Sequence, residues 1–544
     1  MLMPLPVKWQ PRQFTSADVV VVGGGLAALS AAISASDTGA SVVLVNKGVT
    51  GQAGSSAKAA GILAAAFGDG DLHLRPVPDS PAKHAADTLA VGYHVGDPSL
   101  VRHVTDNART AVRWLEDLGV LFSRADDGGY IQLNAPGNSC PRAVSALGGG
   151  KAIMDRLVAQ ARQRGIVILD RVIARQILLD QGRVAGIHIQ GDSHAVIHSP
   201  AVILAAGGAT GLFPSVSGDA NNFGSSLMLG YDAGARLGNL EFIEFTLIYR
   251  VHGQILRIAG MAPFLSRGAR LLNSAGDDLL AQHFPQMPAA QIGRAEILRM
   301  VEGEIRAGRA PVVLDCTGFS DSLWAEFEAS QGSTTLDKIA AAGCDYRREM
   351  IEVLPAAHSV LAGLMIETSG KTSIDGLFAA GENATGIHGA GRLSGNGLTA
   401  CVVMGQSAGT AAAGLSPAGK TPISAADQAA LQTLSLPSSV TMPAPFATML
   451  SGLRQIVGDS LGIIRNDADL KAAQQEFDAI TVEIMAADDG SIAAFELGQM
   501  ARLASLMTAA AIARTESRGV QFRLDHQSLA QGWARAQTLT KPRA

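Results

Sequence analysis

The chain has little charge, few aromatic rings and few cysteines. Of its 544 residues, 17% are charged, 5% are aromatic and four are cysteine. The 43 basic and 48 acidic side chains give a net charge of −5, so the basic surplus of a nucleic-acid-binding protein is missing. The cysteines lie far apart and form no C-x-x-C pair. We therefore expect no iron–sulfur cluster, structural zinc or other metal site held by this chain alone.

Long apolar runs are missing as well. No uninterrupted stretch is long enough to cross a bilayer, so we expect no membrane-spanning helix. The opening residues, MLMPLPVKWQPRQ, carry prolines where a secretory signal would have its apolar core, which predicts a cytoplasmic protein. With 47% hydrophobic residues, the chain can nevertheless bury a large core, which excludes disorder for most of its length.

What the sequence has in excess is glycine, with 61 residues clustered in short loops. The first cluster follows the β-branched strand DVVVV and precedes a helical stretch and a second apolar strand, SVVLV. Gly23, Gly25 and Ala28 give the spacing G-x-G-x-x-A, in which the glycines let the backbone approach a pyrophosphate at a helix N-terminus. In this context the pattern predicts a dinucleotide site, with a tight turn alone as the alternative.

The second strand departs from the usual pattern at its end. Asn46 and Lys47 stand where an acid usually binds the ribose hydroxyl groups. An amide can bond a ribose more weakly than a carboxylate does, or Asn46 can simply start a turn. The residues leave both interpretations open.

Three later glycine loops distinguish FAD from NAD. Gly207 follows the apolar strand AVILAA, Gly381 follows the strand LFAA, and a glycine-rich loop extends to residue 398. A ligand that is contacted by loops from both ends of the chain is long and extended. This arrangement favours FAD over NAD.

The last of these loops carries a family resemblance. GLFAAGENATGIHGAGRLSGNGL is similar to a long motif of the flavoprotein family that contains succinate dehydrogenase, fumarate reductase and L-aspartate oxidase. Further segments resemble the same family in the same order along the chain: GSSAKAAGI at 54–62, PAAHSVLAGLMIE at 355–367, LGIIRND at 461–467 and ARTESRG at 513–519. Several ordered matches of this length are far more specific than a glycine pattern alone.

The resemblance implies an α/β fold with three parts. These are a Rossmann-like FAD-binding domain that is discontinuous in sequence, an inserted α+β capping domain and a C-terminal helical domain. We expect the FAD-binding domain at 14–230 and 352–420, the capping domain at 231–351, and a linker with the helical domain at 421–544. Apolar positions at helical spacing near the C-terminus predict a packing domain without chemistry.

The resemblance also implies FAD that is bound without a covalent link. Members of membrane complexes attach FAD through a histidine, and the matching position here is Ser56, which cannot form that bond. The candidate cofactor-binding residues are Gly23, Gly25, Ala28, Asn46, Lys47, Ser55, Ser56, Gly61, Ala206, Gly207, Gly381, Glu382, Ser394, Asn396 and Leu398.

Three candidate catalytic residues follow from the same resemblance. In the family, the positions of Arg392 and His358 hold a substrate carboxylate, because a planar guanidinium makes two charge-assisted bonds to it. The reacting carbon then faces flavin N5 for hydride transfer. A capping-domain arginine moves a proton at that carbon. The best match is Arg294, although Ala295 replaces the acid that usually follows.

The family pattern breaks at the far end of the substrate. Thr246 stands where dicarboxylate enzymes have a histidine, Pro263 and Phe264 replace a threonine and a glutamate, and Arg267 is retained. Burying an unpaired carboxylate costs on the order of several kcal/mol. We therefore expect a carboxylate substrate other than a simple four-carbon dicarboxylate, bound by Arg392, His358, Thr246 and Arg267, unless the missing groups are replaced by Tyr249, Arg250 or His252.

One further loop has a family match. GNSCPR resembles a family loop in which Asn138 replaces a histidine, and it predicts either a substrate-side loop or a structural one. Cys140 in that loop is interpreted as a packed thiol.

Two functions fit these observations. The first is a soluble FAD-dependent oxidoreductase that resembles L-aspartate oxidase or fumarate reductase. The second is the flavoprotein subunit of an electron-transfer complex with an iron–sulfur partner. We expect a small-molecule carboxylate substrate and no nucleic acid or membrane as partner, and a homo-oligomer is compatible with either function.

Overall fold

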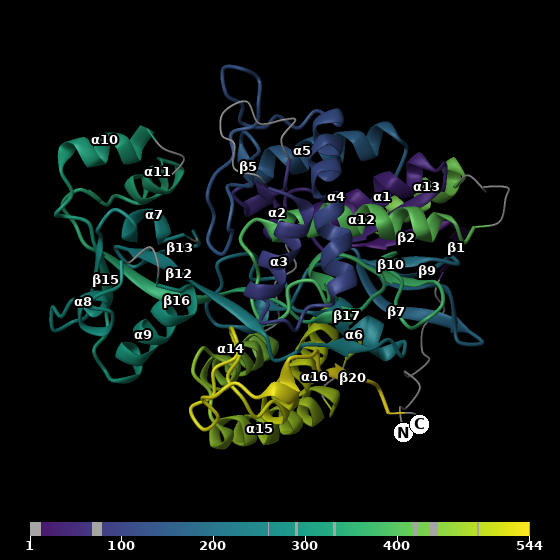
Figure 1. Cartoon of the computed structure of the whole chain (residues 1–544). Helices are drawn as coiled ribbons and strands as arrows, with labels where there is room; N and C mark the ends of the chain where they lie inside the picture. Colours follow the sequence, from purple (N-terminus) through teal and green to yellow (C-terminus); the bar gives the residue numbers. More distant parts are fainter. Residues whose placement is uncertain are drawn as a thin grey trace.

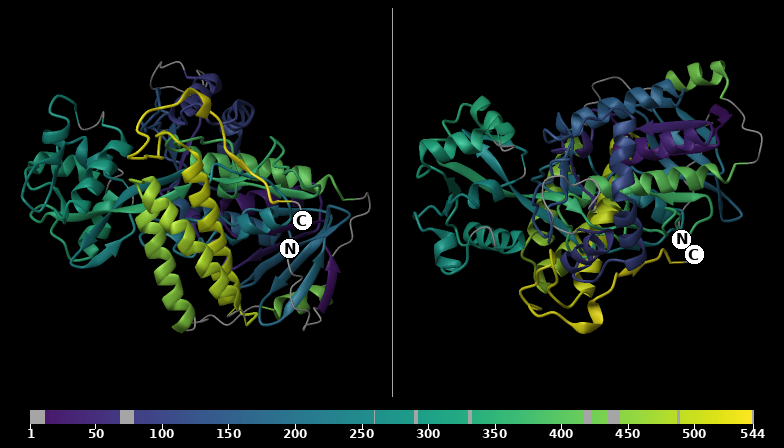
Figure 2. Two further views of the ribbon diagram at one scale, coloured as in Figure 1. Left: turned by 90° about the horizontal axis from the view of Figure 1, so that it is seen from below. Right: turned by 45° about the horizontal axis from the view of Figure 1, so that its top comes forward.

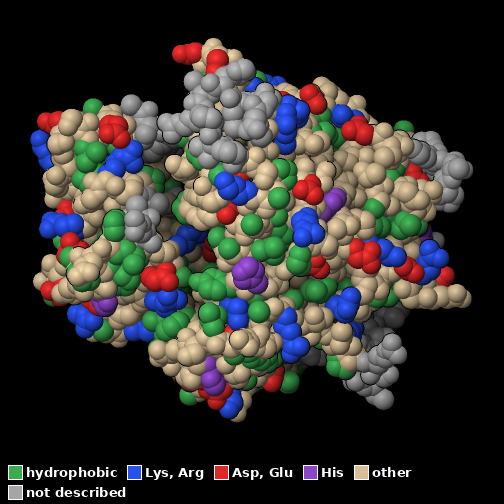
Figure 3. All heavy atoms as spheres, in the orientation of Figure 1, with side chains coloured by type: hydrophobic (Ala, Val, Ile, Leu, Met, Phe, Trp, Pro, Cys, Tyr) green, Lys and Arg blue, Asp and Glu red, His purple; other side chains and the backbone are tan. Residues whose placement is uncertain are grey.

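A computed structural model describes most of the chain, and only these parts are discussed: residues 12–67, 79–258, 260–288, 292–329, 333–416, 423–434, 444–486 and 489–542. Residues 1–11, which carry most of the localisation prediction, and residues 417–422 and 435–443 in the region of the predicted linker lie outside them. No helix within the described ranges is long and apolar enough to span a membrane. On the face shown in Figure 3, basic and acidic side chains are interspersed.

A five-stranded sheet forms the centre of the cofactor-binding part. All its strands are parallel, and the order is β18 (Leu377–Ala379), β10 (Val202–Leu204), β2 (Val19–Val22), β3 (Val42–Asn46) and β6 (Val167–Asp170). Their apolar runs are almost wholly buried, as expected for a parallel sheet covered on both faces. Since β18 follows a long insertion, the domain is discontinuous in sequence, which confirms the predicted fold class.

Small residues bring two helices together on one face of this sheet. α1 (Leu26–Asp37) packs against α12 (Asn396–Ala413), where a Cβ atom at Gly409 would lie 2.1 Å from the carbonyl oxygen of Ala31. Any larger side chain would push the helices apart. Three other helices pack in the same part of the molecule (Figure 1): α3 (Pro81–Val91), α4 (Pro98–Asp117) and α5 (Gly149–Gln163).

A second sheet and several short elements complete this part. The sheet has the order β1 (Arg12–Ser16), β9 (His194–His198), β8 (Arg183–Gln190) and β7 (Ile173–Asp180), with β1 and β9 parallel and the others antiparallel. The short elements are α2 (Ser55–Lys58), β4 (Ile62–Ala64), β5 (Ala143–Ser145), η1 (Thr210–Leu212), α6 (Ser225–Asp232) and η3 (Gly381–Asn383).

The inserted part is built on an antiparallel sheet. Its order is β13 (Gln254–Leu256), β12 (Ile243–Val251), β16 (Ile351–Val360), β15 (Val312–Asp315) and β14 (Arg270–Leu272). Helices around it form the lobe at the left of Figure 1: α7 (Ala262–Leu265), α8 (Leu279–His283), α9 (Arg294–Arg306), α10 (Asp321–Ala329) and α11 (Ser333–Ala341).

Two long strands connect this lobe to the cofactor-binding part. β12 and β16 pair from Ile243 with Val360 to Arg250 with Glu352. Most of β16 falls after the predicted boundary at 352, yet it completes the lobe's sheet. The predicted domain boundaries therefore stay a prediction.

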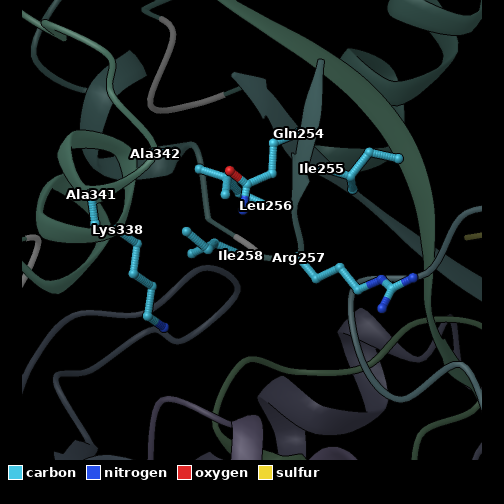
Figure 4. Close-up of a pocket in the computed structure, with 8 residues that line it drawn as sticks. All are labelled: Gln254, Ile255, Leu256, Arg257, Ile258, Lys338, Ala341 and Ala342. Carbon is cyan, nitrogen blue, oxygen red and sulfur yellow. The ribbon is translucent and has the colours of Figure 1, made fainter. Parts of the chain in front are cut away.

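The inserted lobe also has an open hollow of about 440 Å³ (Figure 4). It is lined by Gln254, Ile255, Leu256, Arg257, Ile258, Lys338, Ala341 and Ala342.

The C-terminal part is helical and packs against both other parts. It contains α14 (Ala444–Ser460), α15 (Asp467–Ala486), α16 (Ile492–Ala513) and η4 (Gln531–Trp533). The preceding helix, α13 (Ala425–Gln432), lies apart from them and packs against β1 and β6 of the cofactor-binding part (Figure 1). Figure 2 shows α15 and α16, in yellow-green and yellow, side by side. Near the C-terminus, β20 (Thr538–Leu539) joins a small sheet with β11 (Leu237–Gly238), β17 (Gly363–Met365) and β19 (Ala384–Thr385).

A buried ion pair ties this helical part to the base of β12. Arg514 Nε lies 2.6 Å from Glu241 Oε1, and both side chains are wholly inaccessible to solvent. Glu241 precedes β12 by two residues, so the pair fixes the start of the strand. Breaking such a buried pair is strongly destabilising.

Candidate active site and cofactor cavity

A large hollow opens where β2 and β3 end. It has a volume of about 1020 Å³, and its wall includes residues Gly23 to Ala27 and Val45 to Val49. Gly23 has φ +127°, and a Cβ atom there would lie 2.3 Å from the carbonyl oxygen of Ala205, so only glycine fits. The N-terminus of α1 points into this turn, which provides a site for a phosphate group.

Nine of the predicted cofactor-binding residues line this cavity. They are Gly23, Gly25, Asn46, Lys47, Ser55, Ser56, Ala206, Gly207 and Glu382. They come from both halves of the discontinuous domain, as a long dinucleotide requires. Backbone N–H groups at a helix terminus, close-packed glycines and a long cavity together fit FAD.

The other six predicted cofactor-binding residues lie outside the cavity lining: Ala28, Gly61, Gly381, Ser394, Asn396 and Leu398. Ala28 is buried within the α1 packing, as its expected helix–strand contact requires. The Asn396 side chain is buried and bonded to His84 Nε2 at 2.7 Å and to Thr88 Oγ1 at 2.9 Å. Within the protein, Asn396 therefore serves to join α12 to α3.

Ser56 lies at the N-terminus of α1. Its hydroxyl accepts a hydrogen bond of 3.1 Å from the backbone N–H of Leu26. A Cβ atom at Gly25 would lie 3.2 Å from the same hydroxyl, so glycine keeps this approach open. Ser56 is thus next to the phosphate-binding turn. Its hydroxyl can form a hydrogen bond to the cofactor there, but it cannot form a covalent flavin link.

The end of β3 is connected to the helical part. Lys47 Nζ lies 2.6 Å from Glu496 Oε2 on α16 and 4.2 Å from the centre of the Phe223 ring. Glu496, which is 4% exposed, lines the cavity together with other residues of α14 and α16. Helices α14 and α16 therefore form part of the cavity wall, and the prediction of a packing domain without chemistry stays a prediction. Asn46 bonds Thr50 at 3.3 Å, which leaves its two interpretations open.

Two of the three predicted catalytic residues, Arg392 and Arg294, contact one buried carboxylate, Glu244. Arg392 donates to Glu244 Oε2 from Nε at 3.1 Å and from Nη2 at 2.8 Å, while Arg294 Nη1 lies 3.0 Å from Oε1. The Glu244 side chain is 6% exposed. Burial alone would raise the pKa of Glu244, but the two arginines outweigh it and lower that pKa to about 2.

Two histidines accompany this cluster. His358 lies where β16 bulges, since Glu244 pairs with Ser359 and the next residue of β12 pairs with Ala357. A bulge re-aims side chains, and His358 Nδ1 meets Ser217 Oγ at 2.8 Å. Burial and the charge of Arg392 lower the pKa of His358 to about 4, and burial lowers the pKa of His388 to about 3. Both imidazoles are neutral at pH 7.

The cluster adjoins the cofactor cavity through Glu382. Glu382 lines the cavity and accepts hydrogen bonds from Val360 N at 2.8 Å and from Ser359 Oγ at 3.1 Å. Burial raises its pKa, although the nearby charge of Arg392 opposes the shift. Gly397 makes room for Arg392, because a Cβ atom there would lie 2.5 Å from Nη1.

The residues predicted near the far end of the substrate have different surroundings in the structure. Thr246 is buried on β12, two residues beyond Glu244. Arg267 instead donates to Pro263 O at 3.0 Å and to Glu326 at 3.3 Å, within the inserted lobe. Phe264 is buried and packs against other aromatic rings.

The three residues considered as replacements have partners of their own. Tyr249 bonds Gly260 O at 2.9 Å, Arg250 pairs with Glu352 at 2.5 Å, and His252 lies 2.9 Å from Glu349. None of these contacts turns the side chain toward Glu244.

Sequence reasoning missed Glu244. The available signal was a lone acid within the apolar strand FIEFTL, because an acid on a buried strand requires cationic partners.

In the loop with a family match, Asn138 accepts a hydrogen bond from Arg142 Nη1 at 3.2 Å and donates one to Ser394 O at 3.2 Å. Cys140 is 1% exposed, which agrees with a packed thiol.

Comparisons with known proteins agree with this architecture. Residues 18–398 match the FAD binding domain family, and residues 451–542 match the fumarate reductase flavoprotein C-terminal family. The chain is 36% identical to an L-aspartate oxidase of Caulobacter vibrioides over 93% of both chains. It is 28% identical to a subunit of the fumarate reductase (CoM/CoB) of Methanothermobacter marburgensis over 96% of this chain and 97% of that one.

Among solved structures, Sdh1 of Mycobacterium smegmatis in complex with UQ1 is similar, with a TM-score of 0.80 at 26% identity. The match covers 97% of this chain and 94% of that one. The chain therefore belongs to the FAD-dependent oxidoreductase family that includes the L-aspartate oxidases and the fumarate reductase flavoproteins.

Proposed function

We propose that this oxidoreductase transfers a hydride to or from a carbon beside a substrate carboxylate, and that its substrate is not a simple four-carbon dicarboxylate. The observation that carries the proposal is the position of Arg392. Its guanidinium already makes two hydrogen bonds to one carboxylate, that of Glu244. The cluster that contains both residues adjoins the cofactor cavity through Glu382. A group in this geometry can also bind the carboxylate of a ligand.

Each residue of the cluster then has a defined task. Glu244 uses Nε and Nη2 of Arg392, so Nη1 is the nitrogen left to bind a substrate carboxylate oxygen. His358, held at Nδ1 by Ser217, presents Nε2 to the same anion. When bound, FAD supplies the capacity to accept or donate a hydride.

Arg294 is the candidate for proton transfer. It begins α9 and shares Glu244 with Arg392, which places it on the opposite side of the same carboxylate. An arginine gives up a proton reluctantly at its ordinary pKa. Arg392 is the cationic neighbour of Arg294 across the shared carboxylate of Glu244.

The far end of the substrate is expected to be less charged or more apolar. Thr246 provides one hydroxyl there, while Phe264 is packed among rings and Arg267 is engaged within the lobe. A second carboxylate would be desolvated without a cationic partner, at a cost on the order of several kcal/mol.

The test is anaerobic bleaching of the bound yellow flavin by a panel of carboxylates. The panel contains L-aspartate, succinate and larger carboxylates with one anionic end. We expect bleaching by members of the last group. A clear preference for L-aspartate or succinate would refute the proposed specificity, and oxygen consumption with the active compound separates an oxidase from a dehydrogenase.

A second candidate is the flavoprotein subunit of an electron-transfer complex. It is favoured by one relative, since the matching fumarate reductase chain of Methanothermobacter marburgensis is named as one subunit of its enzyme. Co-purification of a tagged chain with an iron–sulfur protein from its native cell would support this role. Rapid turnover with oxygen by the isolated chain would favour the first function.

A further inference from the structure

Glu244 occupies the place where a ligand carboxylate would compensate the two arginines. Both of its oxygens are used, Oε2 by Arg392 and Oε1 by Arg294. The carboxylate is nearly inaccessible, and the Arg392 side chain is only 16% exposed. The internal acid therefore neutralises part of the anion-binding charge before any substrate arrives.

The charges that face this point can be assigned. Arg392 and Arg294 are cationic, Glu244 is anionic, and the half-buried imidazoles of His358 and His388 are neutral at pH 7. Glu382, toward the cofactor cavity, has a pKa that burial raises, against the opposing effect of its hydrogen bonds and of Arg392. The arginines and Glu244 together retain one positive charge, which matches one carboxylate and not two.

The position of Glu244 on β12 connects it with the substrate end of the site. Glu244 and Thr246 are two residues apart on the strand, so they share one face of it. Between them, Phe245 turns to the other side and packs against Phe213, with ring centres 5.4 Å apart. A negative charge thus lies on the strand face that carries the predicted far-end residue, where it repels a second anionic group.

We propose that Glu244 is a specificity-determining residue, an internal carboxylate that restricts the site to substrates with a single carboxylate. This inference rests on the proposed function, because it assumes that Arg392 binds the substrate anion. Removing the charge of Glu244 leaves two guanidinium groups without an internal counter-ion. The site should then accept a dicarboxylate.

The experiment compares butyrate with succinate, two ligands of equal chain length and different charge. Their dissociation constants are measured on the FAD-loaded protein from the perturbation of the flavin absorption spectrum. For the unchanged protein we expect tighter binding of butyrate. In Glu244→Gln, the ratio of the two constants should shift toward succinate by roughly tenfold or more, as expected for one charged hydrogen-bonding contact.

Glu352→Gln is the matched control. It removes an equivalent carboxylate, which pairs with Arg250 on the same two strands but is 29% exposed and outside the cluster. The control should keep the wild-type ratio. A Glu244→Gln protein that also keeps it would overturn the inference.

The unchanged protein provides a test that does not depend on any variant. If it binds succinate more tightly than butyrate, the inference is wrong even if Glu244→Gln does not fold. Failure of the proposed function looks different. In that case neither carboxylate perturbs the flavin spectrum of the unchanged protein, of Glu244→Gln or of the control, which removes the premise and the inference with it.

Discussion

Lys47 and Glu496 form an ion pair of 2.6 Å across a sequence separation of 449 residues. One partner follows the second strand of the dinucleotide-binding unit, and the other belongs to the helix α16 near the C-terminus. The usual acid at the end of β3 is absent, and a carboxylate from another part of the chain lies beside the cavity instead. The pair therefore connects cofactor binding with the docking of the helical part.

Glu496→Gln should weaken FAD binding. The substitution removes the anionic partner of Lys47, whose amine is then held at the cavity wall only by Asn221 O and the Phe223 ring. We expect the FAD dissociation constant to rise roughly fivefold, measured from the fluorescence of released flavin on dilution. Asp155→Asn, which removes the exposed Lys151–Asp155 pair on α5, is the control and should leave the constant unchanged. If both variants bind FAD with the same dissociation constant, the prediction is wrong.

FAD should leave the protein on denaturation. Ser56 stands at the position of the family's linking histidine, and its hydroxyl cannot make the histidyl bond. After acid precipitation, all yellow colour should remain in the supernatant. Flavin fluorescence that stays with the protein band in a denaturing gel would show that the prediction is wrong.

Arg392→Gln should destabilise the fold as well as abolish carboxylate binding. Glu244 would keep only Arg294, which is 44% exposed, so a buried carboxylate would lose its better partner. We expect the free energy of unfolding to fall by about 3 kcal/mol. Arg250→Gln breaks a more exposed pair with Glu352 and should cost less than about 1 kcal/mol. The free energies of unfolding are measured by denaturant titration. If they fall by similar amounts in the two variants, this prediction is wrong.

Acidification should destabilise the protein through His358. Its pKa falls from 6.5 in the unfolded chain to about 4 in the folded one. Between these values the unfolded chain binds a proton that the folded chain does not, so stability declines as the pH falls. From pH 6.5 to 5 this contributes roughly 1.5 kcal/mol. Over that pH range, the melting temperature of His358→Gln should decline less steeply than that of the unchanged protein. If the two plots of melting temperature against pH run parallel, His358 does not contribute to the acid destabilisation.

Much of the fold was predictable because its signals are local. Gly23, Gly25 and Ala28 occupy one turn and one helix, and a short stretch of sequence suffices to recognise such a unit. Nine of the predicted cofactor-binding residues line one cavity for the same reason, since most glycine loops meet at the ends of parallel strands, and their role toward FAD stays a prediction. The exceptions, such as Asn396, lie in the right loop but bond to other parts of the protein.

The active site was harder to predict because its contacts are not local. Glu244, Arg294 and Arg392 come from a strand, a helix of the inserted lobe and a loop before α12, and no short segment shows that they meet. Arg267 is a further case in which the local sequence does not show the contacts, and its substrate role stays a prediction. Its family match suggested a substrate contact, while neighbouring groups of the lobe engage it.

The wall that α16 contributes to the cavity has a consequence for biosynthesis. Glu496 is translated long after the glycine turn at Gly23, so a nascent chain can present the phosphate-binding turn while one side of the cavity is still missing. Full enclosure of the cofactor has to wait until the ribosome has released most of the C-terminal helices. Truncated products that end before α16 should consequently emerge colourless.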